Sequence, residues 1–363
     1  MMRCLKTIAV VFVLSLAALF PMACGKSPEA TNSAPTTAPS GDGKLHIYTW
    51  SEYLPDDVVK DFTTQTGIPV TIDTYDSNEV LTSKLASGVV SYDLVVPSDY
   101  AIQPLIHDHL ILAIDKSRLT NFGNLDKQFL DQRFDPGNQY SMPYLWGTTG
   151  LAYDKKKIIE PIDSWDPLFD AKYKGQILML DDMRECFVVA LKKLGKSVNE
   201  TDPAVLRQAA DLLKKQHDLV RTYDSMNYDN KLASGDVILA HGWNGQMAKV
   251  VAAKPDQFAY VLPKEGGTIW LDNVCIPTCA RNVDAAYLFM NFILEPRISA
   301  RIVNGVNYAS PNAAARQFVD PKIINDKNIY PIPDMLKGWE FLDDVGGPTM
   351  RKMSQLWTEI KGQ

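Results

Sequence analysis

Short apolar segments alternate with amphipathic segments along the chain, and their order predicts an α/β fold. The stretches Leu45–Trp50, Val70–Tyr75 and 92–96 are rich in β-branched and aromatic residues, which is typical of strands. Helices are expected between these strands at 55–67 and after a capping box at 76–79. An alternation of strands and helices predicts a parallel sheet with helices on its faces.

The pentapeptide Lys-Leu-Ala-Ser-Gly occurs twice, at 84–88 and at 231–235. Each copy ends an expected helix, and a strand and a polar, aromatic loop follow it. This shared order predicts two similar α/β lobes, each with a loop at a strand end that faces a common cleft. Between the copies, residues 142–150 combine proline, aromatic and small residues, which suits a strand that crosses between lobes.

Two further helices should contribute to the core. Residues 285–294 are apolar almost all round, so a helix there should be buried. The last segment places apolar residues at helical spacing, which predicts a core-facing helix: Met350, Met353, Leu356, Trp357 and Ile360.

The segment 177–185 joins an apolar strand to a cluster of acids. If a helix follows the strand, Asp182 and Glu185 share one of its faces. Two interpretations stay open: an ordinary acidic helix start, favoured by the helix dipole, or a pair of carboxylates that binds a positive ligand. In the second interpretation Asp182 and Glu185 contact the ligand, while Asp181 and Arg184 cap and brace the turn.

The N-terminus has the layout of a signal peptide. Arg3 and Lys6 precede an apolar run at 8–20, which is short for a membrane span. Cys24 follows a small residue, and this favours a lipoprotein cleavage site at residues 1–24 with Cys24 lipidated, although Pro21 stands where leucine is usual. Residues 25–43 are mostly Ser, Thr, Pro, Ala and Gly with almost no large apolar residue, so a disordered tether is expected there.

Composition and charge narrow the classes of function. A chain of 363 residues is long enough for two domains, and a net charge of -6 argues against a nucleic-acid partner. Cys186, Cys275 and Cys279 are expected to be free thiols, since no second Cys or His pair accompanies Cys275 and Cys279. His107 and His109 have no evident third ligand, so no metal site is expected.

Aromatic and acidic residues gather at the predicted strand ends and loops: Trp50, Tyr53, Tyr100, Trp243, Trp270 and Tyr308 with Glu52, Asp182, Glu185 and Asp272. Strand alternation places Trp270 and Asp272 on the same face. Aromatic faces can cover methylene groups and attract ammonium groups, and carboxylates can accept charged hydrogen bonds from each nitrogen. The combination predicts a flexible ligand that carries several ammonium groups.

Seven motifs, in this order, resemble those of the bacterial spermidine/putrescine-binding proteins of polyamine ABC importers: Trp-Ser-Glu-Tyr at 50–53, Val-Val-Pro-Ser at 95–98, Met-Pro-Tyr-Leu-Trp-Gly at 142–147, Asp-Asp-Met-Arg-Glu at 181–185, Gly-Trp-Asn-Gly at 242–245, Pro-Lys-Glu-Gly-Gly at 263–267 and Tyr-Ala-Ser-Pro-Asn at 308–312. The resemblance extends from about residue 44 to the C-terminus. It implies a two-lobed, type II-like periplasmic binding fold, in which each lobe is a mixed sheet flanked by helices and two segments cross between the lobes. Lobe 1 would comprise 44–147 plus 271–316, and lobe 2 would comprise 148–270 plus 317–363.

The resemblance also implies roles for individual residues. Five aromatic residues would wall the binding channel: Trp50, Tyr53, Trp243, Trp270 and Tyr308. Asp272 would hold one terminal ammonium, Glu185 the other region of the ligand, and Asp182 an inner amine. Further polar contacts would come from Ser51, Glu52, Ser98, Tyr100 and Ser225.

Two positions depart from the family patterns. Leu342 replaces a Gln found in spermidine-preferring members, and Gln246 stands where putrescine-specific members have an Asp. Spermidine is therefore the first expectation and putrescine the second.

The function expected from the sequence is capture of a polyamine outside the cytoplasm and delivery to the permease of an ABC importer, without catalysis or cofactor. The chain is expected to be a periplasmic monomer that contacts the membrane only through a lipid anchor. The alternative is a secreted sugar-binding protein or glycoside hydrolase, since tryptophan platforms with paired acids also suit sugars.

Overall fold

The computed structural model describes residues 42–362. The predicted signal peptide, Cys24 and all but the last two residues of the predicted tether lie outside the described residues. Within this range, no helix combines the length and the apolar character that a membrane span requires.

The first sheet has three parallel strands in the order β2-β1-β3. The strands are β1 (Leu45–Trp50), β2 (Val70–Tyr75) and β3 (Leu94–Val95), and the intervening helices are α1 (Asp56–Thr66), α2 (Asn78–Ala86) and α3 (Asp99–His107). Cys275 forms an antiparallel bridge with Val95, so the chain that follows β9 makes this sheet mixed. The order of strands and helices confirms the pattern predicted from the sequence.

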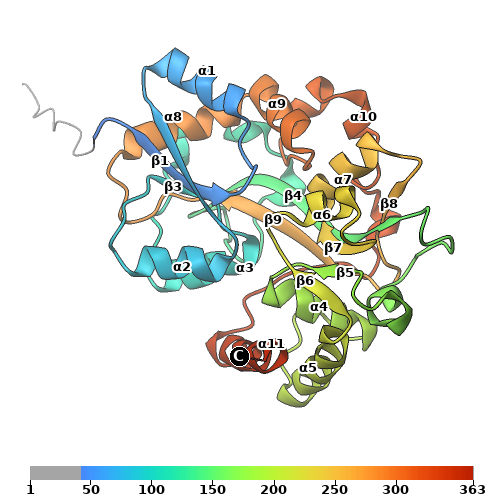
Figure 1. Ribbon diagram of the computed structural model, residues 1–363. Helices are drawn as coiled ribbons and strands as arrows, with labels where there is room; N and C mark the ends of the chain where they lie inside the picture. Colours follow the sequence, from blue (N-terminus) through green and yellow to red (C-terminus); the bar gives the residue numbers. More distant parts are fainter. Residues whose placement is uncertain (1–41, 363) are drawn as a thin grey trace, which may run out of the picture. The chain divides into compact units, whose positions relative to one another are not determined.

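The two faces of β1 pack into two different clusters. Ile47 packs with α1, α8 (Val283–Ile293) and α9 (Pro296–Val306). The next residue, Tyr48, packs with α2 and α3 on the other face. Figure 1 shows these helices above and below the strands, as alternation along β1 requires.

The second sheet has seven strands in the order β10-β9-β4-β7-β5-β6, with β8 paired to β4. Its strands are β4 (Met142–Asp154), β5 (Ile177–Met179), β6 (Val220–Tyr223), β7 (Leu239–Trp243), β8 (Phe258–Val261), β9 (Thr268–Val274) and β10 (Glu340–Phe341). β4 and β9 are antiparallel neighbours, and β5 runs parallel to β6 and β7.

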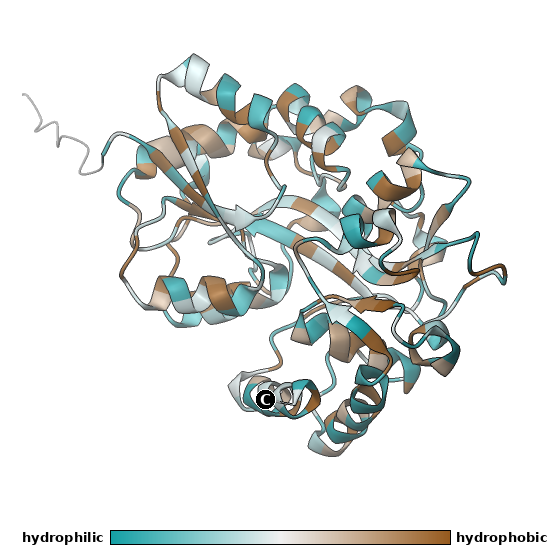
Figure 2. Cartoon of the chain, viewed as in Figure 1, coloured by the Kyte–Doolittle hydropathy of each residue, from teal (hydrophilic) through white to brown (hydrophobic). Residues whose placement is uncertain are grey.

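Helices cover both faces of the second sheet. One cluster joins β5 to α4 (Met183–Lys193), α5 (Pro203–His217) and α11 (Gly347–Lys361), and the other joins it to α6 (Tyr228–Ser234) and α7 (Asn244–Ala253). The remaining helix is α10 (Pro321–Ile324). In Figure 2 these helices show brown bands beside teal ones, which is the pattern of helices with one face in the core.

The crossing role predicted for 142–150 agrees with the packing of β4. Its first residues, including Met142, pack with α1, α8 and α9, and Leu151 and Tyr153 pack with α4, α5 and α11. The chain thus has an α/β fold with two lobes, each built from a helix-covered sheet. The residue boundaries given for the lobes stay a prediction.

Several local predictions need correction. Ser77, not Asp76, caps α2, because its side chain accepts the Val80 N–H. Leu288 in α8 is 50% exposed, so that helix is not buried all round. The repeated pentapeptide does end α2 and α6, and β3 and β7 follow.

Candidate functional site

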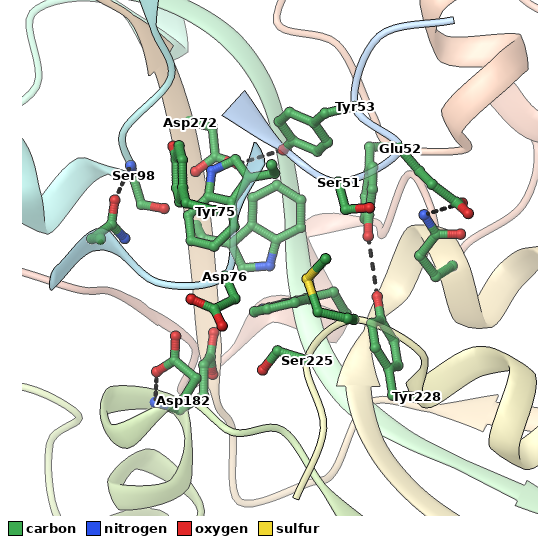
Figure 3. Close-up of a pocket in the computed structure, with 18 of the residues that line it drawn as sticks. Ser51, Glu52, Tyr53, Tyr75, Asp76, Ser98, Asp182, Ser225, Tyr228 and Asp272 are labelled. Carbon is green, nitrogen blue, oxygen red and sulfur yellow. Dashed lines mark hydrogen bonds between the residues drawn. The ribbon is translucent and has the colours of Figure 1, made fainter. Parts of the chain in front are cut away.

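A pocket with about 810 Å³ of empty space, part of it open to solvent, collects residues from both lobes (Figure 3). Every predicted ligand-binding residue lines it: Trp50, Ser51, Glu52, Tyr53, Ser98, Tyr100, Asp182, Glu185, Ser225, Trp243, Trp270, Asp272 and Tyr308. Sequence reasoning did not include these further lining residues: Tyr75, Asp76, Asn78, Asp99, Met226, Tyr228 and Asp229. Asp99 and Met226 are direct sequence neighbours of predicted residues, and this proximity is the signal that could have found these two.

Asp272 enters the pocket from β9 and is 5% exposed. Tyr53 donates its hydroxyl hydrogen to Asp272 Oδ2, while Oδ1 has no hydrogen-bond partner among the described residues. Burial raises the pKa of Asp272 to about 6, although polar contacts with Ser98 and Tyr53 lower it. The free oxygen is therefore available to a donor from outside the chain.

Asp182 has two roles that the sequence analysis had assigned to different residues. It is the N-cap of α4, because its Oδ1 accepts the Glu185 N–H at 2.9 Å. The prediction that Asp181 caps this turn is wrong: Asp181 points to Lys361, and their Oδ1 and Nζ atoms are 3.0 Å apart. Burial raises the pKa of Asp182.

Glu185 is held between the two central strands. Its Oε1 accepts a hydrogen bond from Thr149 Oγ1 at 2.7 Å, and its Oε2 accepts one from Thr268 Oγ1 at 2.8 Å. Burial and then the negative charge of Asp182 raise the pKa of Glu185 to about 7. Sequence reasoning missed Thr149 and Thr268, since they approach Glu185 only when β4 and β9 are paired.

Arg184 braces the start of α4, as predicted. Its guanidinium lies over the Tyr100 ring, 5.0 Å from the centroid, and donates to the carbonyl oxygen of Asp343 at 3.3 Å. Arg184 forms no ion pair within 4.0 Å of the pocket carboxylates in the described part of the chain. The positive charge of Arg184 and a hydrogen bond from its backbone N–H lower the pKa of Asp182, against the larger effect of burial.

The aromatic residues form a connected wall. The Trp50 ring centroid is 5.9 Å from that of Trp243, and the Tyr308 centroid is 5.2 Å from Trp270 and 5.5 Å from Tyr53. All of these pairs meet edge-on or nearly so, which leaves ring faces for other contacts. Trp50 is fixed by a hydrogen bond from its Nε1 to the Val96 carbonyl oxygen.

The far side of the pocket is more exposed and carries Glu52. This residue has a φ of 54°, a left-handed conformation that is uncommon outside glycine, and it is followed by the buried Tyr53. Gln246 Nε2 donates to Glu52 Oε2 at 2.9 Å, and Lys249 Nζ lies 3.4 Å from the same oxygen. Leu342, the other departure from the family pattern, also lines the pocket.

The pocket contains buried carboxyl groups that no cationic side chain of the described residues neutralises. Asp182, Glu185 and Asp272 are 7%, 4% and 5% exposed, and within residues 42–362 no Lys, Arg or His nitrogen lies within 4.0 Å of their carboxylates. Buried carboxylates without a counter-charge are costly. The same range contains no group of three or more His, Cys, Asp or Glu side chains placed to hold a metal ion. The complement that fits is an organic cation.

The predicted free thiols lie outside this pocket. Cys186 and Cys275 are buried and free, and Cys279 is free but only partly buried. They take no part in the lining of the pocket.

Two helix-covered lobes that share a ligand-sized pocket define a solute-binding protein. The chain belongs to the family described as bacterial extracellular solute-binding protein, whose model matches residues 57–331. The resemblance and the fold class inferred from the sequence are thus confirmed.

Several named proteins are similar to this chain over most of its length. The chain is 40% identical over 304 residues to the spermidine/putrescine-binding periplasmic protein of Escherichia coli K12. This alignment covers 83% of this chain and 87% of the relative. A solved structure from Listeria monocytogenes, described as a candidate spermidine/putrescine ABC transporter, matches with a TM-score of 0.85 and 36% identity over 88% of this chain and 99% of that one. The TpPotD lipoprotein of Treponema pallidum matches with a TM-score of 0.78 and 30% identity over 88% of this chain and 99% of that one.

Proposed function

We propose that this protein binds a polyamine in the pocket described above and delivers it to an ABC importer. The observation that carries the proposal is the set of buried carboxylates without counter-charges, Asp182, Glu185 and Asp272, beside a wall of aromatic rings. A polyamine supplies positive charges at fixed intervals and methylene groups between them.

Each part of such a ligand has a partner in the pocket. An ammonium group near Asp272 donates to its unpartnered Oδ1, and another near α4 neutralises the Asp182–Glu185 pair. The methylene groups lie against Trp50, Trp243 and other rings, where each cation–π contact contributes about 0.5–2 kcal/mol. We assign the predicted ligand-binding residues to these contacts, with spermidine and putrescine as the first ligands to test.

The transport role and the location are supported by the relatives. The Escherichia coli relative is described as periplasmic and as binding spermidine/putrescine, and the Treponema pallidum relative is described as a lipoprotein. We infer an extracytoplasmic monomer with a lipid anchor on Cys24, which hands its ligand to membrane permease subunits. No enzymatic step is part of this function.

Calorimetric titration of the purified protein with spermidine, putrescine and a neutral oligosaccharide tests the proposal. Because the buried acids need a cation, we expect at least one polyamine to bind far more tightly than about millimolar, and the oligosaccharide to give no saturable heat. Saturable binding of the sugar together with polyamine binding no tighter than about millimolar would overturn the proposal in favour of a sugar-binding protein.

A further inference from the structure

Arg133 lies in a loop that is attached to the lobe of the first sheet. Phe134, the next residue, is 7% exposed and packs with α2 and α3. The loop is closed by a hydrogen bond from the Asp131 N–H to Asn138 Oδ1 at 2.8 Å. Gln103 Nε2 of α3 donates to the Arg133 carbonyl oxygen at 3.1 Å. The backbone of Arg133 is therefore held against α3.

Asp343 lies in the segment that follows β10 and is attached to the lobe of the second sheet. Its N–H donates to Asn199 Oδ1 at 2.8 Å, and its carbonyl oxygen accepts a hydrogen bond from Arg184 of α4 at 3.3 Å. Asn199 Nδ2 also donates to the Phe341 carbonyl oxygen at 2.8 Å. These bonds hold the backbone of Asp343 against α4 and the loop that follows α4.

The side chains of Arg133 and Asp343 meet across the boundary between the two lobes. Arg133 Nη2 donates to Asp343 Oδ2 at 2.7 Å, and neither residue lines the pocket. An apolar cluster that includes the neighbour of Asp343 also spans both lobes: Tyr100 and Ala101 of α3, Val188 of α4, Val198 and Leu342. The ion pair thus joins the lobes next to an interlobe apolar contact.

The geometry of Asp343 favours a stronger pair than exposed side chains usually form. Such pairs contribute little in general, because both side chains lose freedom and water screens the charges. The side chain of Asp343 is 34% exposed, and Asn199 Nδ2 lies 3.4 Å from the oxygen that Arg133 contacts. This carboxylate is therefore oriented before Arg133 approaches, although the Arg133 side chain is 84% exposed. We expect an effect at the upper end of the range for exposed pairs, about fivefold in an equilibrium constant.

We propose that the Arg133–Asp343 ion pair is an interlobe clasp that holds the two lobes together and slows release of the ligand. The pair forms only while the lobes are close to each other, so it favours the closed arrangement over one in which they separate. Because neither residue touches the ligand, the clasp acts on the rate of release more than on the rate of entry. Its effect on release rests on the proposed function, whereas its effect on the lobes does not.

Charge reversal at the two positions, singly and together, tests the clasp. Small-angle scattering measures the radius of gyration of the full protein without ligand, and stopped-flow tryptophan fluorescence measures the rate of spermidine release. Arg133→Asp and Asp343→Arg each place like charges opposite one another, so each should enlarge the radius of gyration and speed release about fivefold. The double variant restores opposite charges and should return both quantities towards the wild-type values.

Lys264→Asp is the matched control. It reverses one charge of an exposed pair within a single lobe, since Lys264 Nζ lies 3.1 Å from Asp163 Oδ1. This variant should leave the radius of gyration unchanged and alter release by less than about twofold.

The outcomes separate the clasp from the proposed function. If the wild-type protein binds no polyamine, the proposed function fails, and the scattering of the ligand-free variants alone decides on the clasp. If the single reversals at Arg133 and Asp343 behave like the Lys264 control, or if the double variant does not recover, the clasp is wrong and the polyamine function stands. An enlarged radius of gyration in each single variant that the double variant reverses supports the clasp.

Discussion

Asp182 shows how one side chain serves both the fold and the pocket. Asp182 and Glu185 were predicted from the sequence to share one face of a helix, and both line the pocket. The cap was predicted at Asp181, because two adjacent aspartates could each cap and the sequence does not show at which of them the helix begins. In the structure the Glu185 N–H donates to Asp182 Oδ1, so Asp182 is the residue that caps α4.

The Asp272→Asn variant tests whether Asp272, whose Oδ1 has no hydrogen-bond partner among the described residues, binds the ligand. The variant keeps the size of the side chain but removes the charge, so polyamine binding should weaken by about 1.5–3 kcal/mol, the range for a charged hydrogen bond. Calorimetry against the wild type gives this difference. Asp334→Asn, at a position where the side chain is 81% exposed, is the control. An unchanged affinity in Asp272→Asn would remove Asp272 from the site.

At the scale of elements, β4 and β9 position the site. Alternation along β9 correctly predicted that Trp270 and Asp272 share a face, and both line the pocket. The pairing of β4 with β9 could not be predicted, because the two strands are far apart in the sequence. That pairing brings Thr149 and Thr268 to Glu185, and it places Gly147 opposite Trp270.

Gly147→Ala tests the close approach of these two strands. A Cβ at Gly147 would lie 2.4 Å from Trp270 Cζ2 and 2.3 Å from Asn244 Oδ1, so the tryptophan or the strand must move. We expect a loss of about 1–3 kcal/mol in the free energy of unfolding, measured by denaturant titration. Gly123→Ala is the control, since a Cβ there meets nothing within 4 Å, and its stability should change by less than about 0.5 kcal/mol. Equal stability of the two variants would show that β4 and β9 are less closely packed here.

At the scale of the whole molecule, two helix-covered lobes bury acids that the chain does not neutralise. The alternation of strands and helices and the repeated pentapeptide predicted the α/β lobes from local pattern alone. The burial of Asp182, Glu185 and Asp272 could not be predicted, because it depends on contributions from α4, β9 and the loop after β1 together. The raised pKa values of Glu185 and Asp272 follow from that burial. Because of these raised pKa values, the carboxyl groups are partly protonated near neutral pH in the ligand-free molecule, and binding of a cation should change their protonation.

Proton release on spermidine binding tests directly whether buried, uncompensated carboxylates receive the ligand. At pH 6.5 Glu185, with a pKa of about 7, is largely protonated, and Asp272, with a pKa of about 6, is partly so. A nearby ammonium favours the ionised carboxylate and lowers both pKa values, so binding should release protons and should weaken as the pH falls below 7. Titration calorimetry at pH 6.5 in two buffers of different ionisation enthalpy measures this number, and we predict a net release of roughly one proton that disappears by about pH 8.5. Binding with no proton release at pH 6.5, or with proton uptake, would contradict the claim that buried, uncompensated carboxylates receive the ligand.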